Sequence, residues 1–307
     1  GDRCLDGTEL TGDFDGNCRV NFTDLQLLAT HWLKPFEITP VKPDSNHLRV
    51  HYEFDESSGT TASDSSGNGF DATVFSWGNG GWDTADGKFG GSIDCNETEI
   101  FRSLSAGGGD ADIFDTVTSE ITFAWWSKVN PKVMQNQGDS YDHTFCNTLG
   151  NDLYMRWKSR YWESFDRPII QPSFRLGASP EEVSLNMEVD DTRLNGWHHW
   201  AFTKDDEAGV ARMWIDGVPV AELENTVQDM TVLRDATLFS VAYTLHEADQ
   251  YYFGKLDDLR IYDYELSQAE ISYLADKGTW TPPLLDDEEA VDVFDDDEIG
   301  IKDYAAM

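Results

Sequence analysis

The sequence is poor in positive charge. Its 307 residues contain 22 Lys and Arg against 58 Asp and Glu, which gives a formal net charge of −36 at pH 7. Such a surface repels phosphate backbones and anionic lipids, so we expect no nucleic-acid partner. Calcium binds carboxylate oxygens, so it is the cofactor that this composition favours.

The sequence also lacks long apolar runs. A membrane-spanning helix needs about 20 consecutive apolar residues, so we expect no membrane span. The chain starts at Gly1 and shows no signal peptide. We therefore interpret it as a processed protein from the cell surface or the extracellular space.

Cysteine is scarce: the sequence has 4 Cys, namely Cys4, Cys18, Cys95 and Cys146, and no CxxC spacing of the kind that binds zinc. Four cysteines allow three disulfide pairings. We favour Cys4–Cys18 and Cys95–Cys146, because each bridge then stays within one structural unit. An even cysteine count in a processed chain favours an oxidising compartment.

Hydrophobic residues make up 39% of the chain and aromatic residues 13%, enough for a packed core. We divide the chain into a calcium segment (1–34), a stiff Pro-rich linker (35–46), a large β domain (47–279) and an acidic C-terminal tail (280–307).

The sequence of the β domain predicts a series of strands that are separated by turn residues. Asp216-Gly217 between two apolar runs predicts a hairpin. So many antiparallel strands predict an all-β sandwich. One short helix is expected over Ser267–Lys277, where Ser267 and Glu270 form a capping box.

The N-terminal segment carries oxygen ligands with the spacing of an EF-hand loop. Positions 1, 3, 5, 9 and 12 of such a loop supply side chains, and position 7 supplies its carbonyl. The corresponding residues are Asp13, Asp15, Asn17, Asn21 and Asp24, with the carbonyl of Arg19. The alternative is an acidic turn ahead of a short helix.

Residues 13–33 resemble one repeat of a dockerin. Cys18 stands where such loops have glycine, and a bond to Cys4 would support that turn. Dockerins carry two repeats and this sequence has one, so its apolar face needs another surface to pack against.

The β domain resembles the laminin G-like, concanavalin A-like jelly-roll family. The motifs that carry the resemblance are Tyr52-Glu-Phe-Asp55, Asp64-Ser-Ser-Gly-Asn-Gly69, Gly87-Lys-Phe-Gly-Gly-Ser-Ile93, Trp197-His-His-Trp-Ala-Phe202, Trp214-Ile-Asp-Gly217 and Gly254-Lys-Leu-Asp-Asp-Leu-Arg-Ile-Tyr262. The resemblance implies a structural calcium ion where the first and last strands meet.

We expect Asp257 and Asp64 to be the main calcium ligands of the β domain, with Asp55 and Asp258 behind them. Strict alternation would put Asp257 on the same strand face as Leu259 and Ile261, where an unpaired carboxylate is prohibitive. The alternative is that these acids only cap turns.

Catalysis is not expected. Glu53-Phe-Asp55-Glu56 is the nearest approach to the acid triad of jelly-roll glycanases, but Glu56 points away from the other two. His198 and His199 are neighbours on a strand and face opposite sides, so they cannot chelate one ion together.

Trp157, Tyr161 and Trp162 lie in a polar stretch together with Arg156 and Arg160. Exposed aromatic faces stack on sugar rings, so we regard these residues as a candidate glycan-binding surface. The basic residues Arg156 and Arg160 are also a candidate binding site for the acidic C-terminal tail.

Two hypotheses on function remain. We favour a non-catalytic calcium-binding structural or adhesion protein that assembles with other chains, copies of itself included, head-to-tail through its terminal segments. The alternative is a lectin-like carbohydrate-binding module, because this fold serves either role.

Overall fold

The computed structural model describes residues 19–22, 38–76, 80–95, 98–103, 112–129, 141–149, 154–161, 168–175, 183–184, 187–188, 196–224, 229–236, 238–242, 252 and 254–276. For the strands between residues 141 and 188 it describes the backbone. Residues 40–280 form one compact unit, within which the expected β domain lies.

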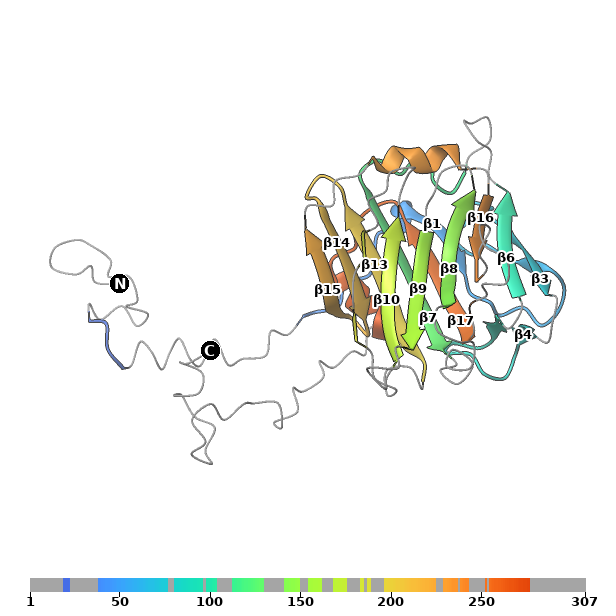
Figure 1. The fold of residues 1–307 in the computed structure, drawn as a ribbon, viewed down its shortest axis with the longest axis horizontal. Coiled ribbons are helices and arrows are strands. Elements are labelled where there is room, and N and C mark those ends of the chain that lie inside the picture. The colour runs from blue at the N-terminus through green and yellow to red at the C-terminus, as the bar shows by residue number, and fades with distance from the viewer. Residues whose placement is uncertain are drawn as a thin grey trace, which may run out of the picture. The chain divides into compact units, whose positions relative to one another are not determined.

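Two antiparallel sheets make up the described part of this unit (Figure 1). The first sheet has the order β15-β14-β13-β7-β17-β5-β4, and β1 also pairs with β17. Its strands are β1 (Leu48–Tyr52), β4 (Gly81–Asp83), β5 (Ser92–Asp94), β7 (Glu120–Val129), β13 (His198–Asp205), β14 (Val210–Ile215), β15 (Val218–Glu224) and β17 (Gly254–Tyr262).

The second sheet has the order β11-β10-β9-β8-β16-β6-β3-β2, and β12 also pairs with β10. Its strands are β2 (Thr61–Ala62), β3 (Ala72–Ser76), β6 (Thr98–Ser103), β8 (Tyr141–Leu149), β9 (Tyr154–Tyr161), β10 (Pro168–Arg175), β11 (Val183–Ser184), β12 (Met187–Glu188) and β16 (Leu238–Val241). Two 3-10 helices, η1 (Ser45–His47) and η3 (Met230–Asp235), complete the connections. The predicted all-β sandwich is confirmed.

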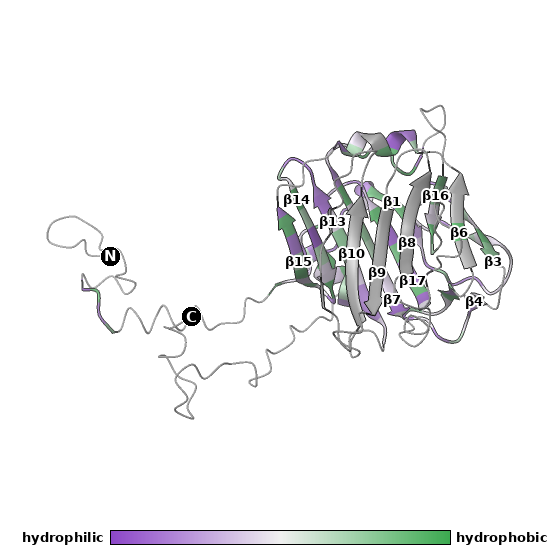
Figure 2. Ribbon diagram, in the orientation of Figure 1, coloured by the Kyte–Doolittle hydropathy of each residue, from purple (hydrophilic) through white to green (hydrophobic). Residues whose placement is uncertain are grey.

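The main core lies between the sheets. Alternate residues of the first sheet point into it, for example Phe123 and Trp125 on β7 and Trp200 and Phe202 on β13. In Figure 2 both hydrophobic and hydrophilic residues lie along β14 and β15. The predicted hairpin joins β14 to β15, and both Asp216 and Gly217 have positive φ, at 49° and 84°.

A second apolar cluster lies on the other side of the first sheet, under helix α3 (Gln268–Asp276). It joins Ile271 and Leu274 of the helix to Ala124, Ala201 and Trp214 of the sheet. The capping box is confirmed: the Ser267 amide donates to Glu270 Oε2 over 2.8 Å and the Glu270 amide to Ser267 Oγ over 3.4 Å.

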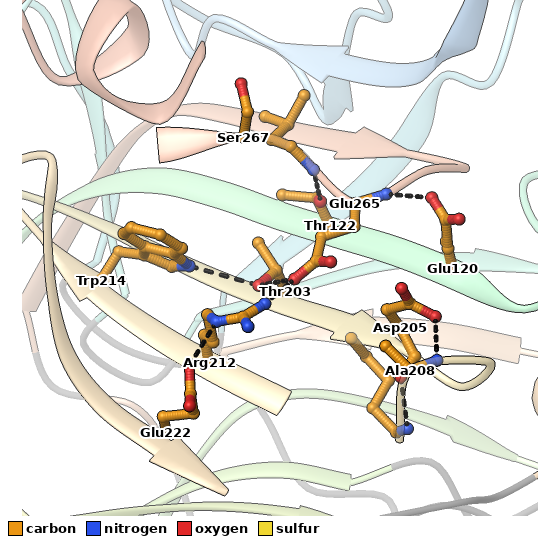
Figure 3. A network of polar contacts seen from close by, with 12 residues as sticks. Glu120, Thr122, Thr203, Asp205, Ala208, Arg212, Trp214, Glu222, Glu265 and Ser267 are labelled. Carbon is orange, nitrogen blue, oxygen red and sulfur yellow. Dashed lines mark hydrogen bonds and ion pairs between the residues drawn. The ribbon is translucent and has the colours of Figure 1, made fainter. Parts of the chain in front are cut away.

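A polar network fixes the turn that leads into α3 (Figure 3). Thr122 Oγ1 accepts a hydrogen bond from the Leu266 amide over 3.0 Å, and Thr203 Oγ1 donates to Glu265 Oε1 over 3.0 Å. Arg212 bridges Glu265, at 2.7 Å, and Glu222, at 2.6 Å. The outer face of the first sheet therefore positions the helix by hydrogen bonds as well as by apolar packing.

The last part of the predicted linker packs against this corner. The Val41 amide donates to the Ala269 carbonyl over 3.0 Å, and the Asp44 amide donates to the Tyr264 hydroxyl over 3.1 Å. Residues 41–44 are therefore anchored to the β domain.

Replacing Ile271 by Ala tests the packing of α3. The side chain is fully buried, so we expect the free energy of unfolding to fall by about 2–5 kcal/mol in chemical denaturation. Gln268→Ala in the same helix is the control and should stay within about 0.5 kcal/mol of the native protein. Equal effects of the two changes would show that the helix does not pack as described.

Candidate functional site

A β-bulge in β17 places two acidic residues side by side. Asp257 pairs with Trp126 and Arg260 with Ala124, so Asp258 and the next residue both lie opposite one residue of β7. Asp258 has φ 53°. The predicted strict alternation along this strand is therefore wrong.

The bulge keeps the core face of β17 apolar. Leu256, Leu259 and Ile261 all belong to the main core, and Asp257 does not. Without the bulge, a carboxylate would have entered the space between the sheets. The extra residue instead leaves both aspartates on the other side of the strand, where polar groups surround them.

Asp257 is fully buried beneath the loop of residues 87–91. Its Oδ2 atom accepts hydrogen bonds from the amides of Lys88, at 2.7 Å, and Phe89, at 2.8 Å. Its Oδ1 atom is buried and has no hydrogen-bond partner. Burial raises the pKa of Asp257 to about 7, and the negative charges of Asp258 and Asp55 add to this increase. The two amide hydrogen bonds lower the pKa but do not offset the effect of burial.

Asp55 is held by the same loop. Its Oδ1 atom accepts a hydrogen bond from the Gly91 amide over 2.6 Å. Gly90 has φ 93°, and a Cβ atom there would lie 2.4 Å from Asp55 Oδ1. The glycines of this motif therefore let the backbone approach the carboxylate closely, and one five-residue loop contacts both Asp55 and Asp257.

The carboxylate of Asp258 is engaged by two basic side chains. Its Oδ1 atom lies 2.8 Å from His51 Nε2, and its Oδ2 atom lies 2.8 Å from Arg260 Nη1. Asp258 is almost fully buried, so these contacts compensate its charge.

Asp64 caps a turn, as the alternative interpretation expected. Its carboxylate accepts hydrogen bonds from the amides of His51, Ser66 and Phe70 and from the Ser66 hydroxyl, at 2.8–3.0 Å. Burial would raise its pKa, but these hydrogen bonds lower the pKa of Asp64 below the usual value. Asp64 thus ties residues 64–70 to β1.

Asp257 and Asp55 are the described residues that could hold a calcium ion in the β domain. A buried carboxylate oxygen without a partner is costly unless a proton or a cation compensates it. The described residues hold no group of three or more His, Cys, Asp or Glu side chains arranged around one metal position. Calcium also accepts backbone carbonyls and water, so two carboxylates are a sufficient nucleus for a site.

The N-terminal calcium loop lies mostly outside the described residues, as do Asp13, Asp15, Asn17 and Asp24. The structure describes Arg19 and Asn21, and the Asn21 side-chain amide donates to the Arg19 carbonyl over 3.4 Å. This calcium site and the dockerin resemblance stay predictions.

The predicted Cys95–Cys146 bridge is wrong. Cys95 is a buried free thiol that contacts the Ile93 carbonyl at 3.8 Å. It follows β5 in the first sheet, whereas Cys146 lies on β8 in the second sheet. Cys4 and Cys18 lie outside the described residues, so their pairing stays a prediction.

The expected glycan-binding residues fall on one strand of the second sheet. Arg156, Trp157, Arg160 and Tyr161 are part of β9, and Trp157 pairs with Pro172 of β10. Their side chains lie outside the description, as does the whole of Trp162. This surface therefore also stays a prediction.

The acids considered for catalysis each hold a loop. Glu53 Oε2 accepts from the Ser65 hydroxyl over 2.8 Å, and Glu56 Oε1 accepts from the Ser63 amide over 2.7 Å. Asp55 is engaged with Gly91. Their hydrogen bonds fit a structural role for all three carboxylates.

One row of buried polar residues was not expected from the sequence. His199, Trp126 and Asp257 are direct neighbours across β13, β7 and β17. Lys88 Nζ lies 4.0 Å from the centroid of the Trp126 ring, and Phe89 meets that ring edge-on. The 87–91 loop thus covers Trp126 as well as Asp257. The cross-strand register that aligns the row has no signal in the sequence.

Comparison with known proteins agrees with this fold. Residues 107–272 match the family described as the concanavalin A-like lectin/glucanases superfamily. No curated protein sequence matches the chain. In the described part of the chain, no helix has the length and apolar character that crossing a membrane requires.

Two solved structures show the similarity in detail. Domain 4 of AbnA, a GH43 extracellular arabinanase from Geobacillus stearothermophilus, in complex with arabinotriose, has 22% identity and a TM-score of 0.51, covering 74% of this chain and 98% of that one. The binding domain of botulinum neurotoxin DC in complex with rat synaptotagmin II has 12% identity and a TM-score of 0.53, covering 78% of this chain. The match spans 53% of that toxin chain. At these identities the likeness concerns the fold.

His199 makes stability depend on pH. Burial lowers the pKa of His199 to about 3. The negative charges of Asp216 and Asp258 raise this pKa but do not offset the effect of burial. An unfolded chain takes up a proton on this residue below about pH 6.5, and the folded chain does not, so the free energy of unfolding falls as the pH falls from about 6.5 towards 3.

We predict that His199→Phe flattens this decline by up to about 1.4 kcal/mol per pH unit. Urea denaturation of both proteins between pH 5 and 8, at saturating calcium, measures the two slopes. Parallel slopes would show that His199 becomes protonated in the folded protein.

Proposed function

Because this chain belongs to the concanavalin A-like lectin/glucanases superfamily, we propose that it is a non-catalytic glycan-recognition protein whose β domain is locked by a bound calcium ion. The single observation that carries the calcium part is the fully buried carboxylate of Asp257, whose Oδ1 atom has no partner. Asp257 and Asp55 would hold the ion.

The ion would supply positive charge beside the two carboxylates that the 87–91 loop contacts. It would compensate the desolvated Asp257 and reduce its repulsion from Asp55. The 87–91 loop donates hydrogen bonds to both carboxylates, so an ion there would also stabilise the loop in its observed conformation. Calcium is thus proposed as a structural cofactor.

A recognition role is supported by what similar folds do. Domain 4 of the arabinanase is in complex with arabinotriose, and the toxin binding domain has been captured with synaptotagmin II and also with SialylT. Saccharides and a protein receptor are therefore the ligand classes to consider, and an extracellular location is part of the proposal. We favour a glycan, for reasons developed in the next subsection.

The assembly hypothesis rests on the terminal segments. Residues 1–18, 23–37 and 277–307 lie outside the described residues. Head-to-tail association through them stays a prediction, and it is compatible with glycan recognition by the β domain.

Calcium-dependent stability tests the proposal. In a background of Asp13→Ala and Asp24→Ala, which removes ligands of the predicted N-terminal site, calcium at 100 times its Kd should add about 2.7 kcal/mol to the free energy of unfolding. Asp257→Asn should abolish this increment. Asp64→Asn is the matched control. It should lower the free energy of unfolding without calcium, because Asp64 caps a turn, but it should keep the full calcium-dependent increment. A full increment in Asp257→Asn would contradict the proposed site.

Absence of hydrolysis is the second test. We expect no release of reducing sugar from a panel of neutral and acidic polysaccharides, because Glu53, Asp55 and Glu56 are engaged in holding loops. A reducing-end assay measures this. Release that disappears in Glu53→Gln would identify a catalytic acid and overturn the non-catalytic part of the proposal.

A further inference from the structure

A compact polar cluster lies beside the row of His199, Trp126 and Asp257 on the first sheet. Lys128 of β7 and Lys255 of β17 are direct cross-strand partners. Asp86, from the loop after β4, accepts from Lys255 Nζ at 2.7 Å and from Lys128 Nζ at 3.0 Å. The cluster joins three separate stretches of the chain.

An aromatic side chain borders this cluster. Trp197 directly precedes β13, and its Nε1 atom donates to Asp86 Oδ1 over 3.4 Å. Trp197 is partly buried. Lys128 and Asp86 are 40% and 38% exposed, so charged groups and the indole are accessible together.

Acidic residues surround the two lysines of the cluster. Asp83 lies 2.6 Å from Lys255 Nζ, and Asp94 of β5 is the cross-strand partner of Lys255, so two lysines lie among three aspartates. Like charges directly opposite on two strands are destabilising, and Asp86 offsets the repulsion between the lysines. In a chain with a net charge of −36, a patch that combines two lysines, several acceptors and an indole is a distinct surface.

We propose that Trp197, Asp86 and Lys128 form a subsite for one ring of a neutral oligosaccharide. This inference rests on the proposed recognition function and names its ligand class and place. A sugar presents an apolar ring face and a rim of hydroxyl groups that both donate and accept. The indole offers a surface for the face, the carboxylate accepts from hydroxyls and the ammonium donates to them.

Electrostatics favours a neutral sugar over an anionic one. Hydrogen bonds from Lys255 and Lys128 lower the pKa of Asp86 to about 2, so its carboxylate remains an acceptor at every physiological pH. A sulfated or carboxylated sugar would meet Asp83 and Asp86 within a strongly acidic protein. A protein partner is disfavoured because interface cores are depleted of Lys and Asp.

The probes for the test are arabinotriose, other neutral trisaccharides made of hexoses, and one trisaccharide that contains a uronic acid. Titration calorimetry on the full chain with calcium present measures the affinity. We expect at least one neutral trisaccharide to bind and the acidic one to bind less tightly. Trp197→Ala should weaken binding at least tenfold, and Asp86→Asn and Lys128→Met should each weaken it several-fold.

Two controls separate stacking from folding. Trp197→Phe keeps an aromatic face and should retain most of the affinity. Trp82→Phe alters another partly buried tryptophan, whose Nε1 atom bonds to the Gly59 carbonyl, and should leave binding unchanged. Thermal melting shows whether each variant is folded.

The outcomes distinguish this inference from the proposed function. Binding of a neutral sugar that survives Trp197→Ala in a folded protein overturns the subsite and leaves the recognition function standing. Preferential binding of the acidic sugar, lost on Arg156→Ala, moves the site to β9 and also overturns it. No binding of any saccharide in the panel overturns both the subsite and the glycan-recognition function.

Discussion

The buried carboxylate of Asp257 constrains everything around it. A desolvated aspartate must find hydrogen bonds and a compensating charge, and the 87–91 loop supplies the hydrogen bonds from Lys88 and Phe89. The same loop reaches Asp55 through Gly91 and covers Trp126 with Lys88 and Phe89. Asp86, which binds Lys128 and Lys255, directly precedes it. The proposed sugar subsite thus depends on the loop that the aspartate holds in place.

This arrangement is consistent with the proposed role of the sandwich in recognising a glycan without catalysing a reaction. Acidic residues near β1 bind backbone amides and hydroxyls of neighbouring loops, so their charge stabilises the fold. The residues left accessible on the first sheet form a balanced set of donors and acceptors beside Trp197. Stability and recognition then use separate carboxylates, Asp257 with Asp55 for the first and Asp86 for the second.

Local signals in the sequence predicted much of the fold. Asp216-Gly217 and the Ser267–Glu270 capping box depend on residues a few positions apart, and both are found where expected. The Gly87–Gly91 motif and Asp257 also pointed to the candidate site through the family resemblance. The Asp64 carboxylate followed the alternative interpretation, because four nearby donors surround it.

Features set by pairing between distant strands could not be predicted in this way. The bulge at Asp257 and Asp258 depends on the register with β7, and it puts Asp257 on the strand face opposite Leu259 and Ile261. The free thiol of Cys95 depends on which sheet each cysteine joins. The partial burial of Trp197 depends on where β13 begins, because the strand starts at His198.

A crystal structure of the full chain grown with calcium tests the central claim most directly, through the anomalous signal of the ion. We expect an anomalous peak about 2.3–2.6 Å from Asp257 Oδ1, with Asp55 as a second carboxylate ligand. A well-ordered site at Asp257 without such a peak, at a calcium concentration that fills the N-terminal loop, would show that a proton rather than a metal ion compensates the buried carboxylate, and would contradict the account.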